Sequence, residues 1–415
     1  MTDPAPTPES APTDEDPPED RRRLIAGLCA FAFFLLGGYG LARPSIESLY
    51  IATYTSRALP YAWLGVAVAA ALATAVYGRF AARVELTRLF GGAIGVVAAL
   101  LALLLLALRL QVPGAAYLLY LWKDVYIVVL VEIFWTIANT HFQLKRATWL
   151  YGFFCACGAA GGAISNFFIG DIALAIGTNQ APLLLFPLFV VLYFITRALP
   201  ETHRQSSDKP RADLAAGFEV LLKSRYLMLL LGVIAIIQIV TALIDYQFNT
   251  IVEAAWPDKD ARTDIVGTVY FAIEISSFTL QITTGIIVAL LGVRGTLLSI
   301  PLILGAALAA FLAAPVFLWM AVAKVANKAL DYSLFRAAKE MLYLPLDYSE
   351  KTQGKAVVDM LTYRAAKAGA SVLILGFEAL AAPPLTAAAI AIGLVALWIG
   401  LIVAILRRYR TRSGA

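Results

Sequence analysis

The chain has 415 residues, of which 60% are hydrophobic and only 15% charged, and its mean hydropathy is +0.78. Apolar runs longer than about 18 residues recur along nearly its whole length, which indicates a polytopic helical membrane protein and excludes a soluble domain of this size. The formal net charge of +5 does not indicate nucleic-acid binding, because the surplus lies in short loops and the C-terminal tail, where Lys and Arg normally set membrane topology.

The N-terminal segment, residues 1–23, differs from the rest of the chain. Its first 20 residues hold six prolines and seven acidic residues with almost nothing apolar, so they cannot bury enough surface to fold. The segment begins acidic rather than basic, unlike a secretory signal. We expect a disordered cytoplasmic tail that ends where Arg21–Arg23 meets the first apolar run.

Twelve membrane-spanning helices are predicted, at residues 24–52, 58–80, 88–110, 115–142, 148–172, 180–199, 226–252, 263–290, 295–313, 315–344, 354–380 and 384–406. Basic residues concentrate in the loops after even-numbered helices and in the C-terminal tail. The odd-numbered loops offer only Arg57, Arg109, Lys259 and Arg262. Because Lys and Arg favour the cytoplasmic side, both termini are expected to be cytoplasmic.

The longest polar connection, residues 200–225, is expected to be a cytoplasmic linker between a six-helix bundle at 24–199 and a second one at 226–406, followed by a basic tail at 407–415. Arg43 lies twenty residues after Arg23, and Asp245 lies twenty residues after Arg225, so the two occupy equivalent depths in the two bundles. This plan resembles that of the major facilitator transporters. The predicted fold class is therefore all-α, a polytopic membrane protein with a major facilitator-like 6+6 arrangement.

Charged side chains within the predicted helices mark candidate functional positions, since a charge near the bilayer centre costs about 2.5–3.5 kcal/mol on insertion scales. In the helix at 24–52, Arg43 and Glu47 are four residues apart and share a face beside Pro44. They are either a cavity-facing cation with a gating or pairing acid, or an ion pair that anchors the outer end of the helix.

The helix at 115–142 places Glu132 near the middle of the membrane, with Lys123 and Asp124 two turns towards the outside. An isolated acid at that depth is typical of an ion-pair partner or a proton acceptor. A purely structural hydrogen-bonding role is the alternative.

Small residues dominate the helix at 148–172. Gly158 and Gly162 form a G-x-x-x-G pair, which indicates close helix packing and not ligand binding. Cys29, Cys155 and Cys157 all fall in apolar segments. We interpret them as small buried hydrophobic residues, and neither a disulfide nor a metal site is expected from them.

Polar stripes run along two helices of the second bundle. Their members recur at helical spacing: Gln238, Thr241, Asp245 and Asn249 in one, and Glu274, Ser277, Gln281 and Thr284 in the other. The first, fourth, seventh and tenth helices usually line a major facilitator cavity, so Asn249 is a candidate substrate ligand. Asp245 and Glu274 are candidates for holding cations or taking up a proton. Interhelical hydrogen bonding is the alternative.

The helix at 315–344 places Lys324, Lys328 and Asp331 at three- and four-residue spacing. We expect Lys328 to pair with Asp331, which would leave Lys324 and Arg336 for an anion, unless Arg336 lies at the cytoplasmic mouth. In the helix at 354–380, Lys367 has no acid within one turn. It is the residue expected to contact phosphate or carboxylate.

Gate or loop salt bridges are expected for Asp359 and for Lys339-Glu340.

The region from Lys324 to Ser371 resembles the ATP/ADP translocase family, the nucleotide carriers of plastids and intracellular bacteria. The resemblance rests on Lys339-Glu340-Met341, Tyr343 with Pro345-Leu346, Gly354-Lys355-Ala356, Asp359, and Lys367 followed by Gly369. Phe134-Trp135, Ala138-Asn139, Tyr151 to Phe154, and Arg43 resemble earlier parts of the family pattern. The resemblance implies an exchanger that moves a phosphorylated substrate across the membrane.

Two positions depart from the family pattern. Ile46 stands where the first-helix motif has a lysine, and Lys123, beside Asp124, stands at an acidic position of the fourth helix. A cation lost at one place and gained at another favours a rearranged site. A smaller or differently charged substrate is therefore an alternative.

Together these features predict a secondary transporter that exchanges a nucleotide-like anion by alternating access, in the manner of an ATP:ADP antiporter. The expected substrate-binding residues are Lys367, Lys324, Lys328, Arg43 and Asn249, and the expected coupling or ion-pairing residues are Glu132, Asp245, Glu274, Asp331, Glu47, Asp124 and Lys123. Alternatives are proton-coupled transport of a non-nucleotide solute and a non-transporting receptor or scaffold.

The partners expected are a small anionic substrate and the lipid bilayer, with no nucleic acid, cofactor or metal, and the chain is expected to act as a monomer. No enzymatic activity is expected, because the sequence has no phosphate loop of the G-x-x-x-x-G-K-[ST] type and its only histidines are His141 and His203. A bacterial inner membrane is the expected location.

Overall fold

The computed structural model describes residues 18–81, 86–141, 144–199, 214–343, 345–347 and 350–413, and the elements of these ranges are helical. The predicted tail up to residue 17 and the linker residues 200–213 lie outside the described residues. So do the side chains of His141, Asp359 and Arg364.

The first half of the chain forms six long helices close to their predicted bounds: α1 Pro18–Tyr54, α2 Leu59–Ala81, α3 Leu86–Arg109, α4 Ala115–His141, α5 Leu144–Ile176 and α6 Leu185–Ala198. Short 3₁₀ turns, η1 Ser56–Ala58 and η2 Ala181–Leu184, precede α2 and α6. Helix α1 begins at Pro18, so the prediction that the tail stays disordered up to residue 23 is wrong for its last residues.

The second half contains α8 Arg225–Ala255, α9 Lys259–Ala313, α10 Phe317–Leu330, α11 Arg336–Leu342, α12 Lys355–Ala379 and α13 Thr386–Ser413. Two π-helical turns are present: η3 Asp331–Phe335 lies between α10 and α11, and η4 Glu350–Gly354 precedes α12. Helix α9 contains two predicted helices joined at Gly292, whose φ of 66° breaks the helical path.

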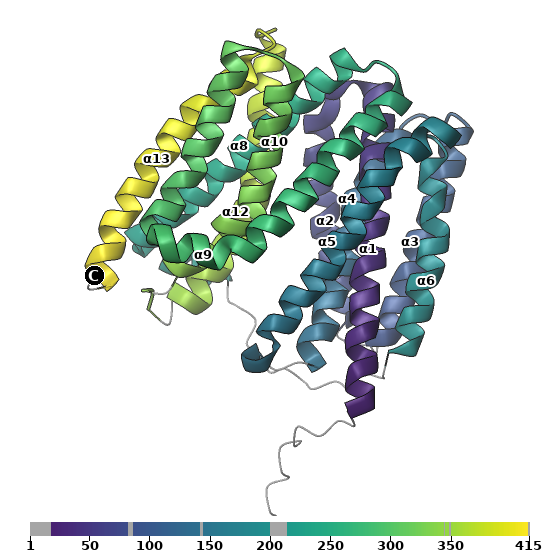
Figure 1. Cartoon of the computed structure of the whole chain (residues 1–415), viewed down its shortest axis with the longest axis horizontal. Coiled ribbons are helices and arrows are strands. Elements are labelled where there is room, and N and C mark those ends of the chain that lie inside the picture. Colours follow the sequence, from purple (N-terminus) through teal and green to yellow (C-terminus); the bar gives the residue numbers. More distant parts are fainter. Residues whose placement is uncertain are drawn as a thin grey trace, which may run out of the picture.

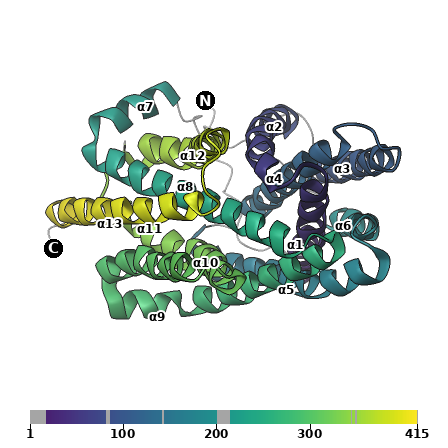
Figure 2. The same cartoon turned by 90° about the horizontal axis from the view of Figure 1, so that it is seen from above.

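Two further features of the second half were not predicted. A short helix, α7 Leu214–Lys223, occupies part of the predicted linker and packs against α8, α12 and η4 (Figure 2). Most of the predicted basic tail is helical, because α13 continues to Ser413.

Eight helices of the described chain are long and apolar enough to cross a membrane, and α9 is one of them. Helices α4, α10 and α12 do not meet that criterion. They carry five of the charges that the sequence marks as functional: Lys123, Asp124, Lys324, Lys328 and Lys367.

The helices form two groups, α1–α6 and α8–α13, which lie side by side (Figure 1). Helix α5 packs against both α1 and α9, and α2 packs against α12. A side chain is excluded where α1 and α5 cross, because a Cβ atom at Gly161 would lie 2.0 Å from the carbonyl oxygen of Phe33. One at Gly158 would lie 2.6 Å from Leu36, which confirms the packing role predicted for that glycine.

The far end of the molecule, opposite the end where α1 begins and α13 ends, is held together by polar contacts between the two groups (Figure 1). The backbone N–H and the hydroxyl of Ser56 donate to Glu253. Arg57 pairs with Glu378 of the second group at 3.5 Å, and within that group the Tyr246 hydroxyl donates to the same carboxylate at 2.5 Å. The two groups are therefore joined at this end, on one side of the candidate site.

Candidate functional site

The centre of the site is Asp245, whose carboxylate contacts the ammonium groups of two lysines. On α8, Asp245 faces α10, where the four-residue spacing of Lys324 and Lys328 places both on one face. The Lys324 Nζ lies 2.8 Å from one carboxylate oxygen, and the Lys328 Nζ lies 3.1 Å from the other. Lys324 is only 1% exposed, so its charge depends on this acid for compensation.

This arrangement corrects the expected pairing of Lys328 with Asp331. Asp331 opens the π-helical turn η3, a distortion that is frequent at functional sites. Its carboxyl lies within electrostatic reach of Lys328, Arg336 and Lys339. Lys324 is consequently not left unpaired, as the sequence had suggested.

The candidate ligand Asn249 lies one turn after Asp245. Its amide donates to the Asp245 backbone carbonyl at 2.8 Å, and its Oδ1 is buried without a hydrogen-bond partner among the described residues. Thr241, a turn before Asp245, donates to Asn327 of α10 at 3.1 Å. Part of the polar stripe on α8 therefore makes the interhelical bonds that were the alternative interpretation.

Arg43 of α1 is held by aromatic rings. Its guanidinium lies 4.0 Å from the ring centroid of Tyr270 on α9 and 5.8 Å from that of Tyr39. The Tyr270 hydroxyl donates to Glu47 at 2.9 Å, so this tyrosine connects the cation and the acid of α1. Both α1 charges thus point towards the other group of helices, which favours the central interpretation over an anchor at the outer end.

Lys123 and Asp124 of α4 contact each other at 2.8 Å. Lys123 is buried, with its Nζ 4.0 Å from the ring centroid of Tyr120, and the Tyr39 hydroxyl donates to Asp124 at 3.3 Å. Lys123, the cation at a position where the sequence departs from the family pattern, is therefore inside the protein and is neutralised by Asp124, its neighbour in the chain.

Lys367 of α12 faces the other half of the molecule. Its Nζ lies 5.5 Å from the ring centroid of Trp63 on α2. It is within electrostatic reach of Asp124, Asp245 and Lys328, yet it forms no ion pair within 4.0 Å in the described part of the chain. Lys367 and Arg43 are the two central cations held by rings rather than by carboxylates.

Two predicted acids lie away from these pairs. The Glu274 carboxyl packs against Gly162 of α5, where a Cβ atom would lie 3.6 Å from it, and is within electrostatic reach of Arg43. Glu132 is exposed on α4, near Tyr77. It is not part of the central cluster, which we define as Arg43, Glu47, Lys123, Asp124, Asp245, Lys324, Lys328 and Lys367.

Sequence reasoning missed the aromatic residues that hold the cations. A signal was present, because Tyr39 lies four residues before Arg43 and Tyr120 lies three before Lys123, on the same helix faces. Trp63 and Tyr270 come from other helices and gave no such signal.

The interpretation of all three cysteines as buried is wrong, because Cys155 is exposed and Cys29 and Cys157 are only partly buried. Within the described residues, no group of three or more His, Cys, Asp or Glu is placed to hold a metal.

Comparison with known proteins decides the family. The sequence model of the TLC ATP/ADP transporters matches residues 183–409, more than half of the chain. The chain belongs to the TLC ATP/ADP transporter family. This confirms the resemblance found in the sequence.

Relatives include the ADP,ATP carrier protein 2 of Chlamydia trachomatis, 25% identical over 83% of this chain and 80% of that protein. The ADP,ATP carrier protein 1 of Chlamydia muridarum is 27% identical, but the match covers 42% of this chain and only 37% of the carrier's length. The plastidic ATP/ADP-transporter of Solanum tuberosum is 26% identical over 49% of this chain and 36% of its own length.

Solved structures share the fold at low sequence identity. The nucleoside transporter NupG (D323A mutant) gives a TM-score of 0.73 at 13% identity, covering 92% of this chain and 99% of that one. A bacterial homologue of the iron transporter ferroportin, in an inward-facing state, gives 0.66 at 12% identity, covering 94% and 99%. The predicted major facilitator-like fold is confirmed.

Proposed function

We propose that this TLC-family transporter exchanges phosphorylated nucleotides, ATP against ADP in the simplest case, by alternating access. The observation that carries the proposal is the central cluster, in which two cations, Arg43 and Lys367, are held by aromatic rings and have no carboxylate of the described residues within ion-pair distance. The names of the relatives support adenine nucleotides as the substrates.

Phosphate oxygens would bind these two cations first, because neither must give up an ion pair. A charge-assisted hydrogen bond to a phosphate contributes about 1.5–3 kcal/mol. Lys324 and Lys328 would follow by exchanging part of their contact with Asp245 for the substrate. The acid then holds the lysines in place when the site is empty and limits how tightly the anion binds.

Alternating access would require the far end to open and the opposite end to close. The Ser56–Glu253 and Arg57–Glu378 contacts between the two helix groups would break in the first step. The substrate would link α1 and α12 through Arg43 and Lys367, which lie on different helix groups. A bridging anion would therefore favour passage between the two states.

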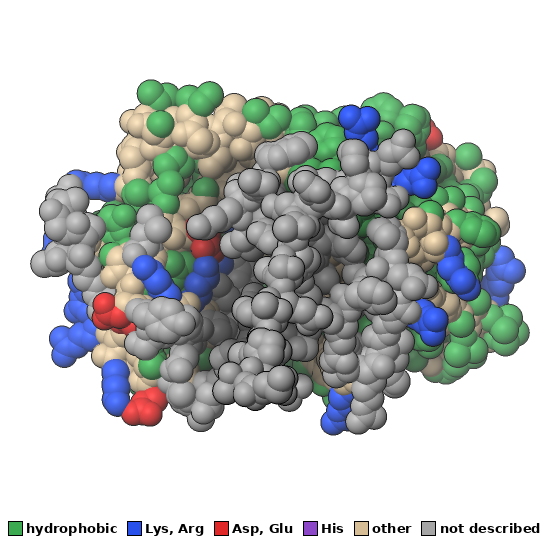
Figure 3. All heavy atoms as spheres, turned by 90° about the horizontal axis from the view of Figure 1, so that it is seen from below, with side chains coloured by type: hydrophobic (Ala, Val, Ile, Leu, Met, Phe, Trp, Pro, Cys, Tyr) green, Lys and Arg blue, Asp and Glu red, His purple; other side chains and the backbone are tan. Residues whose placement is uncertain are grey.

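The orientation follows from the distribution of charge. Seen from the end where α1 begins, Lys and Arg side chains outnumber Asp and Glu on the visible described surface (Figure 3). This supports cytoplasmic termini by the positive-inside tendency. We extend the proposal to a bacterial inner membrane and to a monomer, since one chain supplies every residue of the central cluster.

The test is uptake of labelled ATP into proteoliposomes, empty or preloaded with ADP. Wild-type protein is expected to need internal ADP, and Lys367→Gln is expected to lose about tenfold or more of the uptake rate. Lys223→Gln, which removes a cation from an exposed pair with Glu219, is the matched control and should transport normally. Absence of nucleotide uptake by folded wild-type protein would refute the proposal.

A further inference from the structure

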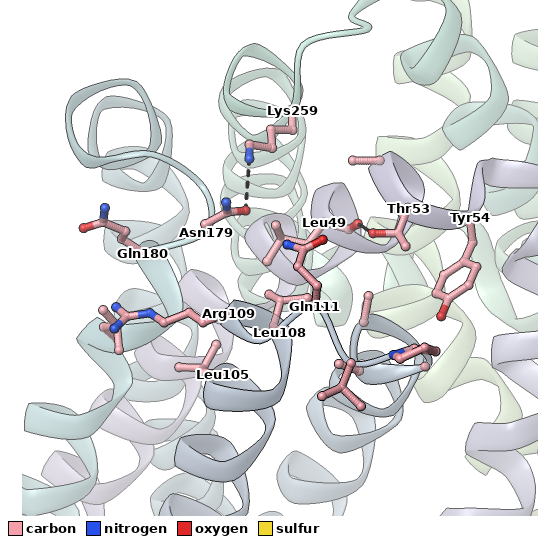
Figure 4. Close-up of a pocket in the computed structure, with 17 residues that line it drawn as sticks. Leu49, Thr53, Tyr54, Leu105, Leu108, Arg109, Gln111, Asn179, Gln180 and Lys259 are labelled. Carbon is pink, nitrogen blue, oxygen red and sulfur yellow. Dashed lines mark hydrogen bonds between the residues drawn. The ribbon is translucent and has the colours of Figure 1, made fainter.

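A hollow lies at the far end of the molecule and shares no residue with the central cluster. Its volume is about 580 Å³, and it is lined by the end of α1, the end of α3 with the turn that follows, the segment between α5 and α6, and the first residue of α9 (Figure 4). This volume falls within the range of about 300–1,000 Å³ that is typical of small-molecule sites.

The hollow is positively charged. Arg109 and Lys259 line it, and none of its lining residues is Asp or Glu. The Lys259 Nζ donates to the Asn179 side-chain oxygen at 3.1 Å (Figure 4), and neither cation has an ion-pair partner within the described ranges. The amides of Gln111 and Gln180 add hydrogen-bond donors.

The backbone of the turn that follows Arg109 is strained, and this turn forms one side of the hollow. Gln111 has a φ of 57°, in the left-handed region that costs a non-glycine residue free energy. Gly114 follows with a φ of 85°. The tight turn returns the chain directly into α4 and leaves Arg109 and Gln111 on the rim of the hollow (Figure 4).

The rest of the lining is largely apolar. Leu49, Leu105, Leu108 and Leu183 come from three different elements and form a wall beside the polar groups. An inorganic anion alone would leave this wall uncovered. The shape and the charge together select a ligand with a charged and an apolar portion.

We propose that this hollow binds an anionic, phosphate-bearing ligand, with its phosphate at the polar rim that carries Arg109 and Lys259 and its apolar portion on the leucine wall. Two sources carry this chemistry: the headgroup region of an anionic phospholipid, and a soluble phosphate ester.

The ligand would also act on the conformational cycle, a consequence that rests on the proposed alternating access. Lys259 belongs to the second helix group, whereas Arg109 and Asn179 belong to the first. The Thr178 backbone N–H donates to Asp260 at 2.7 Å, and the Thr178 and Thr263 hydroxyls lie 2.9 Å apart, so this junction joins the groups. The site is complete only while the far end is joined, and an occupied site favours that state.

The experiment measures equilibrium binding to the purified full chain in neutral detergent. The probes are short-chain phosphatidylglycerol, short-chain phosphatidylcholine, ADP and inorganic phosphate. Wild type is compared with the double variant Arg109→Gln/Lys259→Gln and with Ala52→Phe, which fills the hollow from an exposed lining position and keeps both cations. Lys223→Gln/Arg294→Gln, at two exposed positions outside the hollow, controls for the lost charge. Lys367→Gln identifies binding at the central cluster.

Phosphatidylglycerol is expected to bind the protein with an intact hollow at least about tenfold more tightly than it binds either hollow variant, or else ADP is expected to show this difference when Lys367→Gln is also present. The first result identifies a lipid as the source and the second a soluble ester. Equal affinity in wild type and the hollow variants refutes the proposal, as does phosphatidylcholine binding as tightly as phosphatidylglycerol, or a hollow that takes inorganic phosphate alone. Because lipid binding is measured without transport, failure of nucleotide exchange would leave this result standing.

Discussion

Replacing Asp245 by Asn would remove the negative charge that two buried ammonium groups share. Lys324 is 1% exposed, and the Lys328 side chain is 10% exposed. Breaking a buried ion pair by removing one partner costs about 3–5 kcal/mol, because the remaining charge is left uncompensated. We expect Asp245→Asn to lie at the upper end of that range, since two cations lose their partner.

Removing a lysine instead should cost much less. Lys324→Met leaves Asp245 paired with Lys328 at 3.1 Å, so no buried charge is left alone. The double variant Asp245→Asn/Lys324→Met leaves a single unpaired lysine. Its stability should therefore be higher than that of Asp245→Asn, although it carries one more substitution.

The assay is thermal denaturation of the four proteins in the same detergent, arranged as a double-mutant cycle. Lys223→Met serves as the surface control, because its exposed pair with Glu219 is worth about 0.3–0.5 kcal/mol. If the costs of Asp245→Asn and Lys324→Met simply add, the two residues are not coupled and the account of Asp245 as a shared acceptor is wrong.

Three other predictions concern residues outside this ion-pair group. Glu378→Gln removes the charge that pairs with Arg57 of the other helix group, an exposed pair worth about 0.2–1 kcal/mol, and should modestly increase the labelling of a reporter cysteine placed at the far end; unchanged labelling would contradict a gating role. Gly161→Ala should leave little folded protein in size-exclusion chromatography, whereas Gly92→Ala, with open space around its Cβ position, should behave like wild type. If proton coupling drives transport instead of exchange, uptake should collapse with the proton gradient and ignore internal ADP, and Glu274→Gln should abolish it; uptake that needs internal ADP argues against this.

Most helix positions could be predicted from the sequence because long apolar runs are a local signal, whereas the orientation in the membrane stays a prediction. The bounds differ where α9 joins two predicted helices and where the predicted helix at 315–344 is divided into α10, η3 and α11. Helix α7 was missed because ten residues, Leu214–Lys223, are too short to register as a membrane span. Its apolar residues pack against α8 and α12, which is a tertiary effect.

Which charged residues pair with each other inside the site could not be predicted, because this also depends on tertiary packing. Helical spacing shows that Lys328 and Asp331 share a face, but it does not show that Asp245 of α8 lies closer. The same limit applies to Glu132, whose depth in the membrane is a prediction from the sequence, whereas its exposed direction depends on how α4 packs. Spacing identifies which charges are costly, and packing decides which of them meet.

The two departures from the family pattern acquire a physical meaning in this fold. Ile46 is fully buried, so a lysine there would need a partner inside the protein. Lys123 provides a cation from α4 instead, and its neighbour Asp124 and the Tyr120 ring stabilise it. Lys123 and Lys367 are within electrostatic reach of each other. The positive charge missing from α1 is therefore present on the α4 side, close to the cation that we propose binds phosphate first. A substrate with several phosphates remains compatible with this site, but its phosphate chain would lie towards α4 and α12 rather than along α1.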